Sequence, residues 1–246
     1  MKVLLIGDSC EDRYFYGEAK RLNPEAPVPI LEYRRGVTSK GMVWNVRENL
    51  RSFGVEVYTS THPEEIIKTR YIDEKSNQQI MRYDVEPKIE PLSFDFPSEW
   101  NNLYDALVIS DYDKGFLTTE KIFELTSRFV GPVFIDSKKS NLPADAYIKI
   151  NELEYERMAY CNYENLIITR GGKGAEYKGD LYPAEKVNVC DVVGAGDTFL
   201  AALTYGYLKY GRIDRAIPLA NKAAAVAVSH RGTYILTEED VKKILC

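Results

Sequence analysis

The sequence predicts an α/β fold with a mostly parallel central sheet and a small β-sheet that projects from it. Short apolar runs that end in glycine or a polar residue recur along the chain, as is typical of buried parallel strands. Helical patterns separate most of these runs, which indicates β-α-β connections. Two other segments alternate polar and apolar residues and have no long helix between them. In such a fold the site lies outside the carboxyl ends of the parallel strands.

The first expected strand covers residues 2–7 (KVLLIG) and places Asp8 at its carboxyl end. Runs of the same kind occupy residues 105–110, 131–136, 146–151 and 165–172. Helical periodicity predicts helices at residues 118–130 and 152–160, each between two strands of this set. This alternation of strand and helix predicts a parallel sheet.

Three β-rich segments depart from this rhythm. They cover residues 26–34, 67–73 and 78–83. We expect them to form a small antiparallel sheet built from two stretches, at about residues 22–36 and 66–86. No internal repeat or low-complexity linker divides the chain, so we treat residues 1–246 as a single domain.

The carboxyl-terminal part of the chain is predicted to be helical, because its apolar residues recur at helical spacing. The expected helices cover residues 197–210, 214–229 and 238–245. Pro218 is expected in the first turn of the second helix, where its missing N–H group removes no helical hydrogen bond.

The composition excludes several classes of protein and site. The formal net charge is -5 and no basic block is present, which disfavours a nucleic-acid-binding surface. The longest apolar runs fall well short of the ~20 residues of a membrane-spanning helix, and we expect no signal peptide. Cys10, Cys161, Cys190 and Cys246 lie far apart, without a CxxC pair, so no local zinc motif exists. We therefore expect reduced thiols and a cytoplasmic location.

The most informative stretch is residues 191–199, DVVGAGDTF, which an alanine-rich helical pattern follows. Its glycines allow a tight turn in which successive N–H groups at a helix amino terminus point toward one anion. The stretch is neither a Walker A loop nor a GxGxxG motif. Asp197, at an ordinary pKa of about 3.9, would be ionised near neutral pH and able to accept a hydroxyl proton. For an isolated GAGD, however, a helix cap would be the better explanation of Asp197.

In the context of the whole chain, this motif resembles the carboxyl-terminal signature of the ribokinase-like (PfkB) carbohydrate kinases. Six further blocks match that family in order: GDSCEDRYFYG (7–17), RLNPEAPVPILE (21–32), KTRYIDEKSNQQIMRYDVE (68–86), SDYDKGFLT (110–118), INELEYE (150–156) and LANKAAAVAVSHRGT (219–233). PEAPVP and SDYDKG resemble one branch in particular, the kinase domain of bacterial D-glycero-β-D-manno-heptose 7-phosphate kinases. A lone GAGD is weak evidence, whereas six ordered blocks are specific.

The resemblance implies a ribokinase-like three-layer sandwich that uses ATP and Mg²⁺. It implies that Asp197 is the catalytic base and that the amides of Gly194, Ala195 and Gly196 stabilise the phosphoryl group in transfer. The other positions that match motifs on the ATP side are Asn151 and Glu154 (Mg²⁺ through water), Thr169, Gly171 and Gly174 (a turn beside the phosphates), Asn221 (near the adenine) and Lys138 (phosphate).

Two assignments on the ATP side have structural alternatives. A solvated turn explains Lys138 as well as phosphate binding does. The resemblance also implies a monovalent cation such as K⁺ near Asp191 and the turn at residues 229–232, but a structural turn aspartate is the favoured explanation of Asp191. Both interpretations of each residue stay open at this point.

The sugar side of the site is implied to lie around the first strand. Asp8 and Asp12 could each accept hydrogen bonds from sugar hydroxyls, because each carboxylate oxygen accepts more than one bond. Surface exposure is an equal alternative for Asp12. Gly41 and Asn45 match the family's GGxxN signature. Arg13, Arg82 and Lys114 are candidates to bind a sugar phosphate, or are surface ion-pair partners.

The β-rich segments correspond to the lid of the family. Such a lid closes over the sugar and excludes water, and it often pairs with the lid of a second subunit. The resemblance therefore implies a sugar or sugar-phosphate substrate and a possible homodimer through the lid. Pro27 and Pro29 would protect a free strand edge in this segment.

The chain departs from the family pattern in two places. Where the family has GGAAN, residues 41–45 read GMVWN, so Met42 replaces a glycine and Trp44 a small residue; Arg47 also stands where a small residue is usual. After residue 61 the chain passes almost directly to the lid, so one βα crossover is missing. Three interpretations stay open: a heptose 7-phosphate kinase acting on the anomeric hydroxyl, a kinase for a different sugar, and a catalytically weak relative that binds sugar or nucleotide.

Overall fold

The computed structural model describes residues 1–94, 96–157 and 163–246. The chain divides into two units. Unit 1 comprises Met1–Asp8, Met42–His62 and Ile89–Cys246, and unit 2 comprises Ser9–Gly41 and Pro63–Lys88. Both predicted lid segments, residues 22–36 and 66–86, fall within unit 2. That the two units form one kinase domain stays a prediction.

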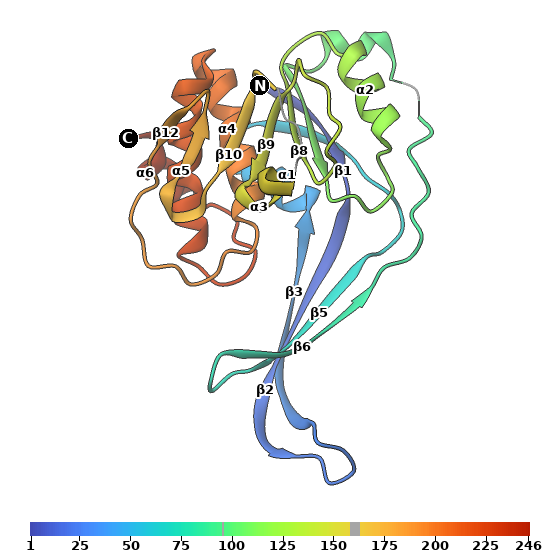
Figure 1. Cartoon of the computed structure of the whole chain (residues 1–246), viewed down its shortest axis with the longest axis vertical. Helices are drawn as coiled ribbons and strands as arrows, with labels where there is room; N and C mark the ends of the chain where they lie inside the picture. The colour runs from blue at the N-terminus through green and yellow to red at the C-terminus, as the bar shows by residue number, and fades with distance from the viewer. Residues whose placement is uncertain (95, 158–162) are drawn as a thin grey trace. The chain divides into compact units, whose positions relative to one another are not determined.

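Unit 1 is built on sheet A, whose eight described strands have the order β12-β11-β10-β9-β8-β7-β1-β4 (Figure 1). The strands are β1 (Lys2–Gly7), β4 (Glu56–Ser60), β7 (Ala106–Asp111), β8 (Val133–Ser137), β9 (Tyr147–Asn151), β10 (Leu166–Thr169), β11 (Ala175–Tyr177) and β12 (Asp180–Tyr182). The strands from β4 to β10 run parallel, and β11 and β12 add an antiparallel hairpin. All five predicted strands of this sheet are confirmed, whereas β4 and the hairpin were not predicted.

The helices of unit 1 include all five that the sequence predicted, with α1 in addition. They are α1 (Val43–Ser52), α2 (Thr119–Arg128), α3 (Glu152–Arg157), α4 (Ala195–Tyr210), α5 (Ile213–Val228) and α6 (Glu238–Leu245), with 3₁₀ turns at η1 (Ser98–Asn102) and η2 (Gly171–Lys173). The helix predicted over residues 152–160 is described to Arg157, and residues 158–160 lie outside the described residues. Pro218 lies inside α5, not in its first turn, so α5 lacks one interior N–H donor.

One face of sheet A and four helices share the main core. Val3 and Leu5 of β1 belong to a buried cluster with residues of α1, α4, α5 and α6. Leu4 and Ile6 are buried outside this cluster, as are Ile122 and Leu125 of α2. Because side chains of a strand alternate between faces, α2 covers the opposite face of the sheet. Both faces are therefore buried, which explains the continuous apolar runs.

Strand β4 ends the sheet at the side where a crossover was predicted to be missing. Its neighbour is β1, and β4 is the last strand in the order of the sheet. The next strand along the chain is β5 (Ile67–Asp73), which belongs to sheet B. Residues 61–66 make this connection and contain neither a strand nor a helix. The sheet thus has one edge without the βα unit expected of the family.

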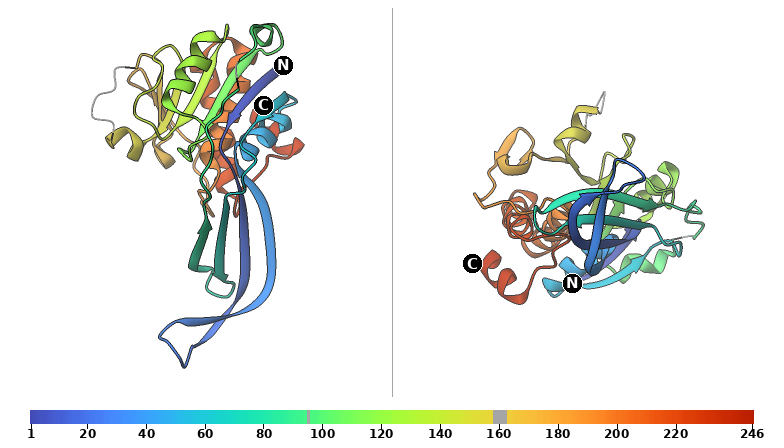
Figure 2. Two further views of the ribbon diagram at one scale, coloured as in Figure 1. Left: turned by 90° about the vertical axis from the view of Figure 1, so that its right-hand side faces the viewer. Right: turned by 90° about the horizontal axis from the view of Figure 1, so that it is seen from below.

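Unit 2 consists of sheet B, with the order β3-β2-β5-β6. Its other strands are β2 (Ser9–Leu22), β3 (Pro29–Met42) and β6 (Gln78–Val85). Figure 2 shows these strands (blue to green) with no helix of their own. The small second sheet is confirmed and β5 pairs antiparallel with β6, but β2 pairs parallel with β5. Strand β2 was not predicted, and β3 extends beyond the predicted segment.

The two faces of sheet B differ, because residues paired directly across strands share a face. The face that we call apolar carries a row of apolar side chains, although Glu11 and Arg13 of β2 also lie on it, and the other is the charged face. Phe15, Tyr71 and Met81 are in register, and Tyr33 packs on Phe15 with 6.0 Å between ring centroids. The residues on the opposite face are Asp12, Lys68, Arg70, Arg82 and Asp84.

Two further findings bear on the predicted class of protein. Cys10, Cys190 and Cys246 are free thiols, and Cys161 lies outside the described residues. Within the described part of the chain, no helix combines the length and the apolar character required to cross a membrane.

We predict that Gly7→Ala destabilises unit 1. A Cβ atom at Gly7 would lie 2.0 Å from the backbone oxygen of Ser110 in β7, an atom that cannot move away without separating the strands. We expect the free energy of unfolding, measured by urea denaturation, to fall by about 3 kcal/mol. Gly172→Ala is the matched control, because no atom lies within 4 Å of its Cβ position; its change should stay within about 0.5 kcal/mol. Equal effects of the two variants would contradict the tight packing of β1 on β7.

Candidate active site

The amino terminus of α4 is a candidate anion site. Gly194 caps the helix in the left-handed conformation at φ 77°, and a Cβ there would lie 2.6 Å from Nδ2 of Asn45. The N–H groups of Gly196 and Asp197 belong to the first turn, whose donors have no carbonyl partner within the helix. The N–H of Ala195 donates a long 3.3 Å bond to the carbonyl of Val192. The predicted glycine loop therefore presents donors and the positive end of the helix dipole to one place.

Asp197 follows this loop with its carboxylate buried, at 3% exposure. The hydroxyl of Tyr112 donates to its Oδ1 at 2.7 Å, and Nδ2 of Asn45 donates to its Oδ2 at 3.1 Å. Burial raises the pKa of Asp197 to about 6. The two donors and Lys149 act to lower this pKa, but burial outweighs them. The ordinary pKa assumed from the sequence is therefore wrong, but the carboxylate is still mostly ionised at neutral pH.

Asn45 is fixed by a chain of amides. Its Oδ1 accepts from Nδ2 of Asn49 at 2.9 Å, and Oδ1 of Asn49 accepts from the N–H of Leu236 at 3.0 Å. Since its oxygen is occupied as an acceptor, the Asn45 amide must turn its NH₂ group toward Asp197. The structure thus places Asn45 at the predicted base; its predicted contact with sugar stays a prediction.

A buried ion pair lies directly behind the glycine loop. Nζ of Lys149, in the middle of β9, lies 2.5 Å from Oδ2 of Asp136 near the end of β8. A Cβ at Gly196 would stand 2.8 Å from the same Nζ, so the glycine lets the ammonium group approach the loop. Burial acts to lower the pKa of Lys149, but Asp136 and Asp197 outweigh it and the pKa is raised. Lys149 therefore adds a fixed positive charge to the anion site.

The loop after β7 connects Asp8 to Asp197. Oδ2 of Asp8, which is fully buried, accepts from the backbone N–H groups of Tyr112 at 2.7 Å and Lys114 at 3.2 Å. Burial and the neighbouring Asp111 raise the pKa of Asp8. Its Oδ1 has no hydrogen-bond partner among the described residues. Asp8 thus anchors the loop that carries Tyr112, and its predicted sugar contact stays a prediction.

Lys138 lies on the site side of the turn after β8. Its Nζ is 5.3 Å from the centroid of the Tyr112 ring. The neighbouring Lys139 instead forms two ion pairs. Its Nζ lies 2.9 Å from Oδ2 of Asp111 and 2.6 Å from Oδ1 of Asp113. Of the two adjacent lysines, Lys138 is the one placed beside the residues around Asp197.

The residues of the NxxE motif form a capping box at the start of α3. The N–H of Glu154 donates to Oδ1 of Asn151, and the N–H of Asn151 donates to Oε2 of Glu154, both at 2.9 Å. Within the described residues, no cluster of three or more His, Cys, Asp or Glu side chains could hold a metal. Glu154 nevertheless interacts electrostatically with Asp136 and Lys149. This arrangement fits a Mg²⁺ ion that keeps several waters and is bound by substrate phosphates and by one or two carboxylates.

Four other predicted positions on the ATP side have structural tasks. Thr169, Gly171 and Gly174 form the predicted tight turn, in which Gly174 has φ 106° and its Cβ position lies 2.0 Å from a backbone oxygen of Tyr182. Nδ2 of Asn221 donates to the carbonyl of Tyr182 at 2.8 Å. The turn is therefore formed as predicted, while the ATP contacts of these residues stay predictions.

Asp191 has the geometry of a structural turn aspartate. Its Oδ1 accepts from the N–H of Val193 and its Oδ2 from the N–H of Gly232, both at 3.0 Å. These bonds join the loop before α4 to the turn after α5. They account for Asp191 without a cation.

Four of the remaining predicted sugar residues, Asp12, Arg13, Gly41 and Arg82, belong to unit 2, whereas Lys114 belongs to unit 1. Asp12 is buried and its Oδ1 lies 2.5 Å from Nη1 of Arg70, while a Cβ at Gly41 would stand 2.3 Å from Oδ2 of Asp12. Arg82 shares the charged face of sheet B with Asp12 and Arg70. Arg13 projects from the opposite face, because it is one residue away from Asp12 in the same strand. The structure therefore does not bring Arg13 together with Asp12 and Arg82.

The residues that depart from the family pattern differ in their placement. Met42 caps α1 at φ 57° and ψ -126°, a conformation that favours glycine and costs a larger residue about 1–3 kcal/mol. Arg47 is two residues from Asn45 on α1, so at about 100° per residue it faces away from Asp197. It lies over the Trp44 ring at 5.2 Å and beside Glu48. Arg47, which stands where the family usually has a small residue, therefore does not face Asp197.

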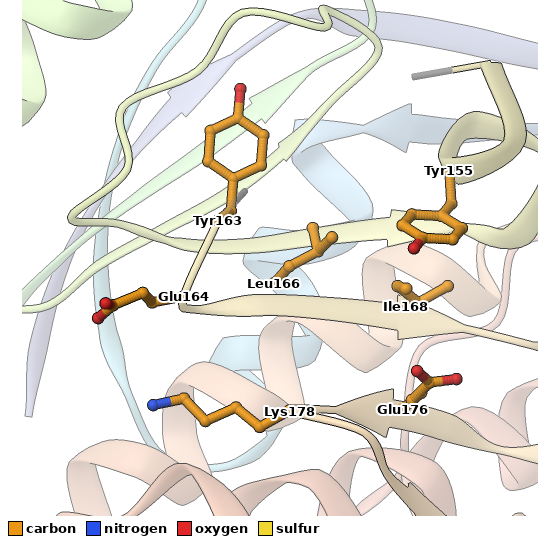
Figure 3. A pocket seen from close by; sticks show the side chains of 7 residues that line it. All are labelled: Tyr155, Tyr163, Glu164, Leu166, Ile168, Glu176 and Lys178. Atoms are coloured by element: carbon orange, nitrogen blue, oxygen red, sulfur yellow. The ribbon is translucent and has the colours of Figure 1, made fainter. Parts of the chain in front are cut away.

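A cavity of about 500 Å³ lies elsewhere on unit 1 (Figure 3). It is lined by Tyr155, Tyr163, Glu164, Leu166, Ile168, Glu176 and Lys178. Leu166 and Ile168 alternate along β10 with Ile167, which belongs to the core formed with α4 and α5. The cavity is therefore on the opposite face of the sheet and contains none of the predicted site residues.

Sequence reasoning missed three residues around Asp197: Tyr112, Lys149 and Asn49. A signal existed for Lys149, because a lysine at a buried position of an apolar parallel strand needs a buried partner. Tyr112 lay in the SDYDKG block without an assigned role. Its partner Asp197 is 85 residues away, and nothing local indicates that contact.

Comparison with known proteins finds matches to carbohydrate kinases. Residues 146–240 match the model of the family described as pfkB family carbohydrate kinase. The chain is 30% identical over 307 residues to the bifunctional protein HldE of Helicobacter acinonychis (strain Sheeba), covering 99% of this chain and 66% of that protein. It is also 30% identical to the bifunctional protein HldE of a Nitratiruptor species, covering 98% of this chain and 64% of that protein.

The chain thus spans less than two thirds of the length of these relatives. The match to the Helicobacter protein extends over 307 positions against the 246 residues of this chain, so at least 61 positions have no counterpart here. This difference agrees with a segment missing from this chain, although it does not place that segment.

Solved structures establish the ribokinase-like α/β fold. Ribokinase from Thermotoga maritima matches with a TM-score of 0.69 at 17% identity, covering 99% of this chain and 98% of that one. Phosphofructokinase-2 from Escherichia coli matches with a TM-score of 0.73 at 17% identity, covering 98% and 97%. Arabidopsis thaliana ribokinase complexed with ribose and ATP matches with a TM-score of 0.70 at 15% identity, covering 99% and 98%.

We predict that Asp197→Asn stabilises the protein above pH 6. The folded-state pKa of Asp197, about 6, exceeds its ordinary value of 3.8, so the stability that this group contributes at low pH is lost as the pH rises from about 3.8 to about 6, and the loss is complete above the folded pKa. Asparagine removes the buried charge and keeps both hydrogen bonds, because the Tyr112 hydroxyl can turn to accept. The gain should be about 2–3 kcal/mol at pH 8 and should vanish near pH 4.

Urea denaturation at pH 4, 6 and 8 checks this prediction. Asp145→Asn is the matched control, since Asp145 is exposed and its substitution should change the free energy of unfolding by no more than about 0.5 kcal/mol. If Asp197→Asn is no more stable than the wild type at pH 8, then the ionised carboxylate of Asp197 does not lower the free energy of unfolding, and the prediction is wrong.

Proposed function

We propose that the chain is a carbohydrate kinase of the pfkB family, a phosphotransferase with a sugar acceptor, and that it transfers the γ-phosphoryl group of ATP to a sugar hydroxyl. The single observation that carries this proposal is the ionised carboxylate of Asp197 beside the N–H donors of the α4 amino terminus. A group that accepts a proton and a site that stabilises an anion are the two requirements of this reaction.

In the proposed reaction, each of several residues of unit 1 has a separate role. The sugar oxygen forms a bond to the γ-phosphorus while the bond from that phosphorus to the β-phosphate oxygen of ATP breaks, and ADP leaves. Asp197 takes the hydroxyl proton. The N–H groups of Gly196 and Asp197 stabilise the charge on the phosphoryl oxygens, and one such donor is typically worth ~3 kcal/mol. Lys149 and Lys138 supply positive charge from behind and beside the loop.

Mg²⁺ belongs to this proposal as a partner of ATP. When bound, it would spread the negative charge of the phosphates and favour their transfer geometry. Glu154, with Asn151 behind it in the capping box, would hold it through water. A K⁺ ion near Asp191 is a weaker proposal, because both carboxylate oxygens already accept backbone bonds. Use of ATP and the free thiols agree with a cytoplasmic location, which we include in the proposal.

For the acceptor, we propose a heptose 7-phosphate or a similar sugar phosphate, with transfer to the anomeric hydroxyl. The support is the set of sequence blocks shared with heptose 7-phosphate kinases and the identity to HldE proteins. Asp12, Gly41 and Arg82 of unit 2 stay predicted sugar contacts. The placement of Arg47 away from Asp197 removes one reason to expect a blocked site, so a catalytically active protein is favoured over one that only binds ligands.

We predict that Asp197→Asn lowers kcat by at least ~10²-fold, because the other carboxylate beside the glycine loop, that of Asp136, is paired with Lys149. ADP release is measured with MgATP and a panel of heptose 7-phosphate, fructose, ribose and their phosphates. Asp145→Asn serves as the control and should keep the wild-type rate. Near-normal turnover of the position 197 variant would overturn its role as base. The absence of ADP release with every acceptor, together with a ligand-induced thermal shift, would favour the binding protein.

We also propose a homodimer through the apolar face of sheet B. Phe15, Tyr33, Tyr71 and Met81 share this face; Tyr33 is 66% exposed and Met81 51% exposed. Unit 2 has no helix of its own to cover them. Apolar faces of this kind commonly mark interfaces between protein chains.

Met81→Lys should convert a dimer into a monomer in sedimentation velocity experiments, because it places a charge in the centre of the proposed interface. Lys75→Glu, on the exposed turn between β5 and β6, is the control and should stay dimeric. A wild-type protein that sediments as a monomer at every concentration would end this proposal.

A further inference from the structure

Each oxygen of the Asp197 carboxylate receives one hydrogen bond from a different element. Tyr112, which follows β7, donates its hydroxyl to Oδ1 at 2.7 Å, and Asn45 of α1 donates its amide to Oδ2 at 3.1 Å. Two donors from two elements hold the carboxylate in one plane. Because an oxygen of a carboxylate has two acceptor positions, each oxygen keeps one for a substrate.

The backbone around Tyr112 is fixed by two hydrogen bonds to aspartate carboxylates. Its backbone N–H donates to the buried carboxylate of Asp8 at 2.7 Å. The next residue, Asp113, has φ 57° and donates its N–H to Oδ1 of Asp111, which fixes the turn that carries Tyr112. A side chain anchored in this way delivers its hydroxyl to a fixed point, and a fixed donor stabilises a charge without reorganisation.

The surroundings of Asp197 make this donor important. The charged groups that face the carboxylate are Asp136, which repels its charge, and Lys149, which is already paired with Asp136. The remaining contacts are the two neutral donors, Tyr112 and Asn45. A buried carboxylate without such bonds would take up a proton and lose its capacity to act as a base.

We propose that Tyr112 is a positioning residue for the reaction, one that keeps the Asp197 carboxylate ionised and oriented so that it can take the proton of the sugar hydroxyl. This inference rests on the proposed function and adds a residue to it. It also assigns a task to Asp8, whose carboxylate fixes the backbone of Tyr112. Tyr112 does not touch the transferring atoms in this account, so it is not itself a catalytic residue.

Tyr112→Phe tests the proposal, since it removes the hydroxyl and keeps the ring and the backbone bond to Asp8. The pKa of Asp197 is measured on the protein without substrate, by ¹³C NMR titration of labelled aspartate carboxyl groups, with the Asp197 signal identified by its loss in Asp197→Asn. We expect the midpoint to rise from about 6 by about one pH unit in Tyr112→Phe. A merely structural role would lower stability without moving this midpoint.

Tyr147→Phe is the matched control. It removes the hydroxyl of another half-buried tyrosine, which lies 3.3 Å from the hydroxyl of Tyr207 on α4. Tyr207 is ten residues, or about 15 Å along the helix, from Asp197. The control should leave the Asp197 midpoint unchanged. An unchanged midpoint in Tyr112→Phe, or an equal rise in the control, would overturn the proposal.

A second measurement needs no substitution, in case Tyr112→Phe does not fold. The ring carbon of Tyr112 that bears the hydroxyl, labelled with ¹³C in the wild-type protein, should shift with the same midpoint as the Asp197 carboxyl. Independent behaviour of the two signals would contradict the hydrogen bond. Neither experiment requires turnover, so a failed kinase assay with a positive titration would reject the proposed function alone.

Discussion

The site depends on keeping one ionised carboxylate buried at the amino terminus of a helix. Asp197 has lost nearly all contact with water, and burial opposes its charge. The positive end of α4, two neutral donors and the ammonium group of Lys149 offset this cost. The same N–H groups that favour the carboxylate also favour a phosphoryl group, so the base and the anion site are parts of one electrostatic arrangement.

The parallel sheet is what brings these groups together. Asp8 and Tyr112 stand just beyond the carboxyl ends of β1 and β7, Asp136 is next to the last residue of β8, and Lys149 lies in the middle of the short neighbouring strand β9. Such ends meet at one edge of a parallel sheet. Helix α4 adds Asp197 and α1 adds Asn45, and the shared core of these helices fixes the distance between them. A chain that is short at the β4 edge can therefore still carry a complete set of groups around Asp197.

Local patterns predicted much of the fold and the centre of the site. Strands with both faces buried have continuous apolar runs, and the glycine loop before Asp197 has a local signature. Strand β2 was not recognised, because consecutive charged residues such as Asp12 and Arg13 interrupt the alternation of polar and apolar residues, and β11 and β12 have only three residues each. The partners of Asp197 could not be predicted, since Tyr112 and Asn45 lie 85 and 152 residues from it. The raised pKa follows from burial, which no local pattern of the sequence shows.

The central claim is that Asp197 contributes a negative charge inside an anion site and acts on the proton, not on the binding of ATP. Isothermal titration calorimetry of MgATP with the wild type and Asp197→Asn at pH 8 tests this most directly. Removing a negative charge beside the phosphates cannot weaken the binding of an anion by charge, so the account predicts an equal or lower Kd in the variant. A Kd raised tenfold or more would show that Asp197 supports nucleotide binding and would contradict the account.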